Sequence, residues 1–362
     1  MKNWSLLFLP LLVFGLSNCG DNSTMTTTIS GSGSNSDAEW LIPANEVRDG
    51  GPGKDGIPAV NNPNFSPVAE IDFLSSDDLV IVVKSNEEVR AYPHPILDWH
   101  EIANDELADG TSLSLTYCPL TGTAIGWNSN LNGVKTTFGV SGLLYNSNLI
   151  PYDRATDSYW SQMEHKCVKG ELAGEEIETI HLVEMPYSLL QVMYPEAIVM
   201  NTETGFSRDY QRYPYGDYRT NHQNIIFPVG NRDERLPSKE RVLGVSIFGQ
   251  AITYRFDAFA NEEVNVVQNR FVGTDLVVVG SKDKNFLTAY GRTLEDGTTL
   301  QFEAVQNELP IVMRDNEGNE WDMFGHAVKG PRAGEQLPEV LNYIGYWFSW
   351  AAFNEGLEIH EE

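Results

Sequence analysis

The chain has 362 residues, and its 51 acidic against 24 basic residues give a formal net charge of −27. This balance excludes nucleic acid as an expected partner, because binding it requires lysine and arginine to neutralise phosphates. The three cysteines are too few for a disulfide framework.

The first 19 residues predict an export signal. A short basic opening, MKN, precedes an apolar run over residues 4–16 that is too short for a membrane-spanning helix. The run closes with LSNC at Cys19, which resembles the lipobox of bacterial lipoproteins. In that family the cysteine is lipidated, so we expect Cys19 to anchor the chain to the outer membrane or cell surface rather than the inner membrane. The alternative is a soluble secreted protein.

The rest of the chain predicts a tether and then two lobes. Residues 20–45 are rich in Ser, Thr, Gly and Asn without apolar periodicity, which predicts a flexible tether. The remaining three hundred or so residues exceed the usual size of one core. We predict lobe one over 46–200 with a Gly/Pro-rich N-terminal arm, a Tyr/Arg-rich insertion over 201–240, and lobe two over 241–362.

The expected elements of both lobes are mostly short strands. Val-rich segments bounded by Gly, Asp and Asn predict strands at 78–85, 112–117 and 275–280. A helix is expected over 94–105, "HPILDWHEIAND", beginning near Pro95. Aromatic segments from Pro186 and from Gly345 are also expected to be helical. These elements predict a β-rich α+β fold.

An internal repeat supports the two lobes. "YWSQMEHKCVKGELAGEEI" from Tyr159 pairs with "EWDMFGHAVKGPRAGEQL" from Glu320 when one residue is skipped. Cys167 then faces Ala327, which predicts a packing role for this cysteine. Cys118, at the end of an expected strand, faces Ser281 instead. Lobe two can therefore do without the cysteine, and we predict two related lobes from an internal duplication, with the site in lobe one.

Three functions remain open for that site. In the first, Cys118 is a nucleophile and His100 its base, since the thiolate is the reactive form. In the second, a metal site, copper first, uses Cys118 with His94 or His100, and the thioether of Met163 would complete the ligand set. In the third, the protein is a surface binding or assembly protein with a buried Cys118. The sequence assigns no cofactor; the one considered is the single metal ion of the second alternative.

Three stretches then carry a resemblance to a known family. "GGPGKDGIPAV", "AYPHPILDWHEIANDELADGTSLSLTYCPLTGTAIGW" and "FGVSGLLYNSNLIPYDRATDSYWSQ" resemble the bacterial exported proteins of the domain of unknown function 3179, over Gly50 to Phe353. The family pattern reads Cys-Pro-Leu-Cys, and Thr121 stands here at the second cysteine. Besides the catalytic pair, the resemblance implies motif positions that we expect to bind substrate: Lys54, Asp55, Tyr145, Asn146, Asp153, Arg154 and Gln162.

The resemblance implies no activity. Together with the residues, it leads us to expect an envelope-anchored protein with thiol-dependent chemistry on a small or envelope-derived substrate. In that scheme Asn146 and Arg154 orient the substrate beside Cys118.

Overall fold

The computed structural model describes residues 39–260 and 262–361. The predicted signal peptide, its lipidation site Cys19 and tether residues 20–38 lie outside these residues. The described residues all belong to one compact unit. Among them, no helix has the length and apolar character needed to cross a membrane. The first half of this unit comprises residues 39–200 and the second half residues 241–361, with the insertion 201–240 between them.

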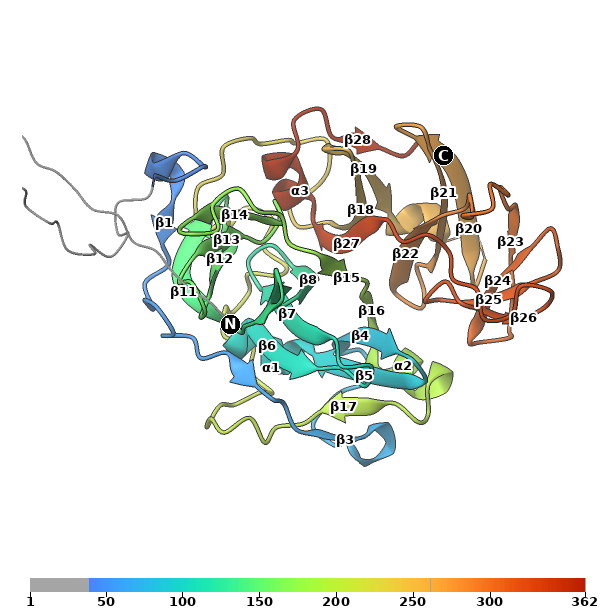
Figure 1. Ribbon diagram of the computed structural model, residues 1–362, viewed down its shortest axis with the longest axis horizontal. Helices are drawn as coiled ribbons and strands as arrows, with labels where there is room; N and C mark the ends of the chain where they lie inside the picture. The colour runs from blue at the N-terminus through green and yellow to red at the C-terminus, as the bar shows by residue number, and fades with distance from the viewer. Residues whose placement is uncertain (1–38, 261, 362) are drawn as a thin grey trace, which may run out of the picture. The chain divides into compact units, whose positions relative to one another are not determined.

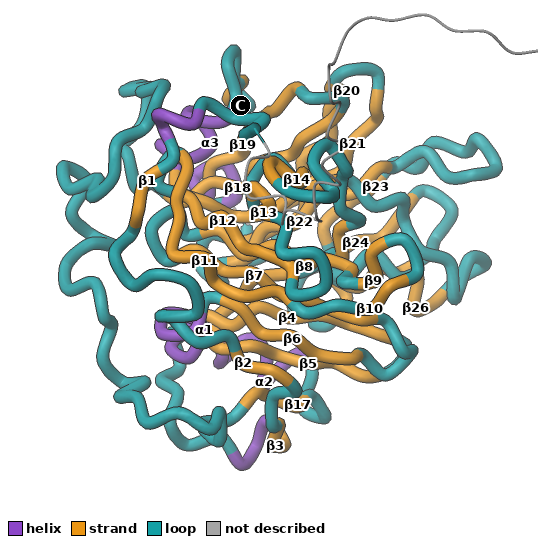
Figure 2. Tube along the Cα trace, turned by 60° about the vertical axis from the view of Figure 1, so that its left-hand side comes forward, coloured by secondary structure: helices purple, strands orange, loops and turns teal. Residues whose placement is uncertain are grey.

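The described residues form a β-rich structure with few helices, as the sequence predicts (Figures 1 and 2). Their α-helices are α1 (His94–His100), α2 (Tyr187–Met193) and α3 (Trp347–Phe353). Short 3-10 turns lie at Ala44–Glu46, Val68–Glu70 and Phe256–Phe259. The helix expected over 94–105 begins where predicted but stops at His100, because Glu101 is left-handed with φ 59° and Ile102 enters a strand.

Each half contains a central sheet built around one hairpin. In the first half the strand order is β16 (Val183–Pro186), β4 (Leu79–Ser85), β5 (Glu88–Pro93), β17 (Ile198–Met200) and β3 (Phe65–Pro67). In the second half the order is β27 (Leu341–Tyr346), β18 (Arg241–Ile247), β19 (Gln250–Arg255) and β28 (Glu358–Ile359). In both, a later strand joins the hairpin antiparallel on one side and a short strand joins it in parallel on the other.

Two further kinds of sheet flank these central sheets. In the first half, the first kind is a sheet with the strand order β15 (Thr179–Ile180), β8 (Thr123–Asn128), β7 (Ser112–Cys118), β6 (Ile102–Glu106) and β2 (Val60–Asn61). In the second half it is a sheet with the order β20 (Asn265–Phe271), β21 (Thr274–Ser281) and β22 (Phe286–Gly291). In the first half, the second kind is a sheet with the strand order β1 (Arg48–Asp49), β11 (Phe138–Tyr145), β12 (Asn148–Asp153), β13 (Tyr159–Ser161) and β14 (Lys166–Lys169). In the second half it is a sheet with the order β23 (Phe302–Ala304), β24 (Ile311–Asp315), β25 (Glu320–Asp322) and β26 (Ala327–Lys329). A small ribbon pairs β9 (Asn130–Leu131) with β10 (Val134–Lys135).

Both central sheets are buried on both faces, which explains their nearly continuous runs of apolar residues. In β4, Ile81 and Val83 pack toward β7 of the same half, whereas Val80 and Val82 share a core with strands β21, β22 and β24 of the second half. The second sheet reverses this arrangement. In β18, Leu243 packs toward β21 of its own half, whereas Val242 shares a core with β7 and β8 of the first half. Each half therefore supplies a wall of the other half's core.

Candidate functional site

Cys118 is the last residue of β7 and pairs with Thr123 across a tight turn. The turn closes with Gly122, at φ 65°, whose N–H donates to the Cys118 carbonyl at 2.8 Å. The side chain is buried, and its Sγ lies 3.7 Å from the Ser147 carbonyl oxygen. Burial and the nearby Glu101 carboxyl raise the pKa of the thiol to about 11. In this closed state Cys118 is therefore a neutral thiol at neutral pH.

Glu101 is the titratable partner of this thiol, and it is absent from the predicted site residues. Its side chain is buried, and the Tyr215 hydroxyl donates to its Oε1 at 3.3 Å. Burial raises the pKa of the carboxyl to about 7. Its left-handed backbone is uncommon for a buried residue that is not glycine, and such backbone conformations concentrate at functional sites. In the sequence, Glu101 lies inside the helix expected over 94–105, directly after His100, and an acid at such a position is a weak signal.

His100, the predicted base, makes its contacts elsewhere. Its Nδ1 lies 2.7 Å from the Pro58 carbonyl oxygen, and its Nε2 lies 2.7 Å from the Tyr210 hydroxyl. Burial lowers the pKa of the imidazole. Both ring nitrogens are thus engaged, and among the described residues the charge that acts on the Cys118 thiol is the Glu101 carboxyl.

The residues of the metal alternative are also separated by their contacts. His94 Nε2 lies 3.0 Å from Glu184 Oε2, and Arg241 bonds the other oxygen of the same carboxyl. Burial alone would raise the pKa of Glu184, but Arg241 and His94 outweigh it and hold the pKa at about 2. Met163 lines a different cleft. Across 39–260 and 262–361, no group of three or more His, Cys, Asp or Glu residues could hold a metal ion.

The Tyr/Arg-rich insertion covers the thiol and the carboxyl. The Tyr218 hydroxyl donates to the Leu120 carbonyl at 2.9 Å, next to the Cys118 turn, and Tyr215 bonds Glu101. Arg219 binds the buried carboxylate of Asp98 at 2.6 Å and lies over the ring of Tyr213. The segment 213–219 thus closes over the site and is fixed to helix α1 by an ion pair.

A buried hydrogen-bond network supports the turn after Cys118. Asn148 Nδ2 donates to Thr121 Oγ1 at 2.9 Å and to Gln162 Oε1 at 2.6 Å. Gln162 Oε1 also accepts from Thr123, and its Nε2 donates to the Thr116 carbonyl at 3.0 Å. Of the predicted ligand-binding residues, Gln162 is the one that reaches this turn. Thr121, which replaces a cysteine of the expected pattern, is held here as a hydrogen-bonding residue.

Three other predicted residues gather at a second place, around Tyr152 on β12. Asp55 accepts hydrogen bonds from Tyr152 and from Arg154, the latter at 2.9 Å. Lys54 pairs with Asp157 and places its ammonium 3.9 Å from the centre of the Tyr152 ring. These bonds fasten the N-terminal arm to β12, and none of them reaches Cys118 or Glu101.

The remaining predicted residues bond to the protein itself. Asp153 accepts from Trp160 Nε1 at 3.0 Å and from Thr156. The Asn146 side chain accepts from the Gly230 N–H at 2.8 Å and donates to a carbonyl at the end of α3. The ring of Tyr145 packs edge-on against an aromatic ring of α3. These contacts are those of structural anchors.

The second cysteine supports the packing role expected for it. Cys167 is fully buried on β14, its Sγ lies 3.5 Å from the Lys169 carbonyl oxygen, and burial raises the pKa of its thiol to about 11. Cys118 and Cys167 are both free thiols. Cys167 therefore resembles Cys118 in burial and pKa, and the carboxyls that act on its thiol are those of Asp153 and Glu175.

Comparison with known proteins places the chain in a family. A model of the family described as protein of unknown function (DUF3179) matches residues 54–356. The chain belongs to this family. The DUF3179 match begins at the arm residue Lys54 and includes the insertion, the Cys118–Glu101 site and every strand of the central sheets except β28. A search of curated proteins and a search of solved structures found no match.

Proposed function

We propose that this DUF3179 protein carries out thiol-dependent chemistry in which Cys118 is the nucleophile and Glu101 its general base. The observation that supports this proposal is a buried carboxyl with a pKa of about 7 whose charge raises the pKa of a buried thiol. Their backbones are neighbours, since the N–H of Tyr117, the residue before Cys118, donates to the Glu101 carbonyl at 2.6 Å. A general base works best when its pKa lies near the working pH. His100 is the less suitable base, because both of its ring nitrogens are already bonded.

The chemistry can be stated for the two side chains. The Glu101 carboxylate takes the Sγ proton as the sulfur forms a bond to an electrophilic carbon of the substrate, and the protonated carboxyl then supplies a proton to the leaving group. A ligand reaches the sulfur only when segment 213–219 moves, because Tyr215 and Tyr218 cover the pair. This requirement favours a small substrate or an exposed end of an envelope polymer.

The test is alkylation of the full-length chain by iodoacetamide between pH 5 and 9, with each cysteine quantified by peptide mass spectrometry. We expect the Cys118 rate to rise through an inflection near pH 7. Glu101→Gln should remove the inflection and lower the rate at pH 7 by about 100-fold, the usual contribution of a general base. Cys167 is the matched control in the same sample, because its pKa is also about 11.

A closed cover could mask the thiol, so Tyr215→Ala is the second variant. We expect it to accelerate alkylation of Cys118 and leave Cys167 unchanged. The proposal fails if, with the cover loosened, Cys118 reacts no faster at pH 7 than Cys167. It also fails if Glu101→Gln has no effect in that background.

We also propose that the protein is exported and lipid-anchored through Cys19. The supporting feature is the apolar run that closes with LSNC. Metabolic labelling with palmitate should mark the chain, and Cys19→Ala should abolish the label. Unchanged soluble secretion of that variant would contradict the anchor.

We further propose that the two halves descend from an internal duplication. Both central sheets have the same strand order around one hairpin, and both hairpins continue into the same two kinds of flanking sheet. Single hydrogen bonds agree as well. Trp160 Nε1 donates to Asp153 at 3.0 Å, and Trp321 Nε1 donates to Asp315 at 2.9 Å. In this duplication Asp153 and Asp315 are therefore counterparts.

A further inference from the structure

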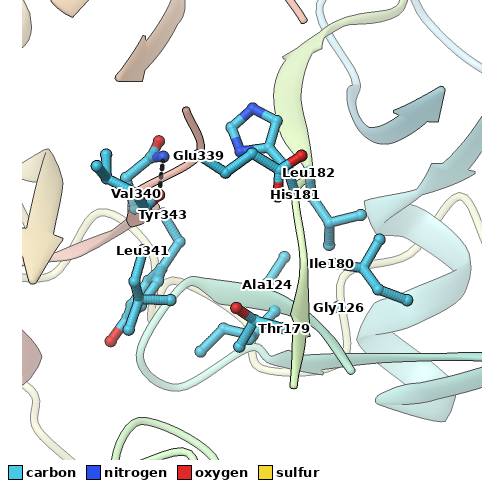
Figure 3. Close-up of a pocket in the computed structure, with 12 residues that line it drawn as sticks. Ala124, Gly126, Thr179, Ile180, His181, Leu182, Glu339, Val340, Leu341 and Tyr343 are labelled. Atoms are coloured by element: carbon cyan, nitrogen blue, oxygen red, sulfur yellow. Dashed lines mark hydrogen bonds between the residues drawn. The ribbon is translucent and has the colours of Figure 1, made fainter. Parts of the chain in front are cut away.

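A separate cleft lies between the two halves, away from the bonds of Cys118 and Glu101. It has a volume of about 640 Å³ and is lined from the first half by the turn before β14 and from the second half by the β18–β19 turn and the end of α3. A smaller cavity of about 100 Å³ adjoins it through Thr179 and Leu341, which line both. Figure 3 shows this smaller cavity, where residues of β15 and its continuation face those around Leu341.

His165 is the unusual residue of the cleft. Both of its ring nitrogens are buried, and neither has a hydrogen-bond partner among the described residues. Leaving a buried polar atom unpaired costs about 1–3 kcal/mol. Burial lowers the pKa of the imidazole to about 4, so at neutral pH the ring has one N–H donor and one acceptor. The free protein thus holds a donor and an acceptor that nothing in the described residues satisfies.

The backbone of His165 adds a second cost. Its φ is 53°, in the left-handed region that favours glycine. The equivalent turn of the second half has Gly325, at φ 74°. Equivalence rests on matching bonds: the Ile177 N–H donates to the His165 carbonyl at 2.9 Å, and the Leu337 N–H to the Gly325 carbonyl at 2.8 Å. The first half therefore has a strained histidine without hydrogen-bond partners where the second half has a glycine, which adopts this backbone without strain. Strain that is kept in this way points to a function of His165.

The other lining residues define the ligand. Met163, Phe353 and Phe248 offer apolar surface, and Phe248 is 87% exposed. The charged lining groups are the exposed carboxylates of Glu164 and Glu176. Burial raises the pKa of Glu164, and the charge of Lys166, which does not line the cleft, partly offsets this effect. The site is thus apolar and acidic, with a neutral imidazole.

We propose that this cleft binds an organic cation with an apolar body, whose polar hydrogens bond the acceptor nitrogen of His165 and whose charge faces Glu164 and Glu176. An anion is disfavoured, because the lining has two carboxylates and no lysine or arginine among the described residues. The apolar body packs on Phe248 and Phe353. This site is independent of the proposed chemistry at Cys118.

The test is calorimetric titration of the full-length chain with three matched probes: 2-naphthylmethylamine, the neutral 2-naphthylmethanol and the anionic 2-naphthoate. We expect the amine to bind at least tenfold more tightly than the other two. His165→Gly should weaken amine binding at least tenfold. This variant should fold, because Gly325 occupies the equivalent turn, and its melting temperature should not fall.

Two surface variants provide the comparison within and outside the cleft. Phe248→Ser, within the cleft, should lower the affinity for the amine several-fold. Val192→Ser, at an exposed apolar residue of α2, should have no effect. The proposal is overturned if no probe saturates, if the alcohol or the naphthoate binds as tightly as the amine, or if His165→Gly leaves the affinity unchanged.

Discussion

The turns after β7 and β21 hold the same place in the two halves, but their side chains face different ways. In the second half, Ser281 accepts the Lys284 N–H at 3.1 Å, and Asn265 donates to two carbonyls of the preceding turn. Both side chains thus support their own backbone. In the first half Cys118 ends β7 and Glu101 directly precedes β6, and the Glu101 carboxyl raises the pKa of the Cys118 thiol. The first half thus has two titratable groups at this place, where the second half has an uncharged hydroxyl and an uncharged amide.

A second difference lies behind the site. The buried His94–Glu184 pair of the first half corresponds to Phe256 and Ile344 in the second, which belong to an apolar core. The first central sheet therefore has an ion pair at this place, and the second central sheet has an apolar contact. This makes substitutions from one half into the other an informative test of both.

The largest effect is expected at the ion pair. Glu184→Ile alone should destabilise the protein by about 3–5 kcal/mol, because it leaves the partly buried guanidinium of Arg241 and the buried imidazole of His94 without their partner. The double variant His94→Phe/Glu184→Ile should regain at least half of that loss, since it installs the second half's solution. Denaturant titration of the two variants measures both values. If the double variant is no more stable than the single one, the two places are not equivalent.

The Glu184 carboxyl also makes the stability of the protein depend on pH, and the sign of this dependence follows from its pKa. The pKa of Glu184 is lowered to about 2 in the folded protein, so its stabilising contribution is present above the unfolded value of about 4.5 and is lost as pH falls toward 2. The stability lost by Glu184→Ile should therefore shrink when the titrations are repeated at low pH. A difference that stays constant with pH would contradict the assignment.

A smaller effect of opposite sign is expected at Glu101. Its folded pKa of about 7 lies above the unfolded value of about 4.5, so ionisation opposes folding as pH rises through this window. Glu101→Gln should leave stability unchanged at pH 4.5 and increase it by about 3 kcal/mol at pH 8. Asn265→Ala, the matched change in the second half, should have the same effect at both pH values. Equal effects of Glu101→Gln at both pH values would refute a buried, titrating carboxyl.

The smallest effect is expected for Cys118→Ser. The second half has serine at this strand end, and the new hydroxyl can donate to the Ser147 carbonyl that now faces the thiol. We expect a change in stability within about 1 kcal/mol, measured by thermal unfolding. A much larger loss would show that the thiol is needed for packing and would weaken the case for a chemical role.

Local patterns predicted much of this fold. The strands β4, β7 and β21 appear where valine-rich runs predict them, and α2 and α3 where aromatic segments do. The error over 102–105 arose because "HEIAND" has helical composition, while pairing of Ile102 and Asn104 with β7 overrides local propensity. Strand pairing between distant segments is not visible in one sequence.

The candidate site was predicted only in part, for a similar reason. Cys118 stood out because its counterpart in the repeat differs. Glu101 reaches it through a left-handed backbone that no sequence pattern signals, and Tyr215 reaches it from an insertion more than a hundred residues away. The motif residues Asp153 and Asn146 anchor turns, a role that motif matching does not distinguish from ligand binding.

The reciprocal packing of the central sheets bears on how such a protein can evolve. Val80 and Val82 of the first half rest on strands of the second, and Val242 of the second half rests beside the Cys118 strand. Neither half can then be deleted alone, because its removal would strip an apolar wall from the core of the other half. Selection on either half thus maintains the buried strands of the other, whose exposed loops remain free to diverge.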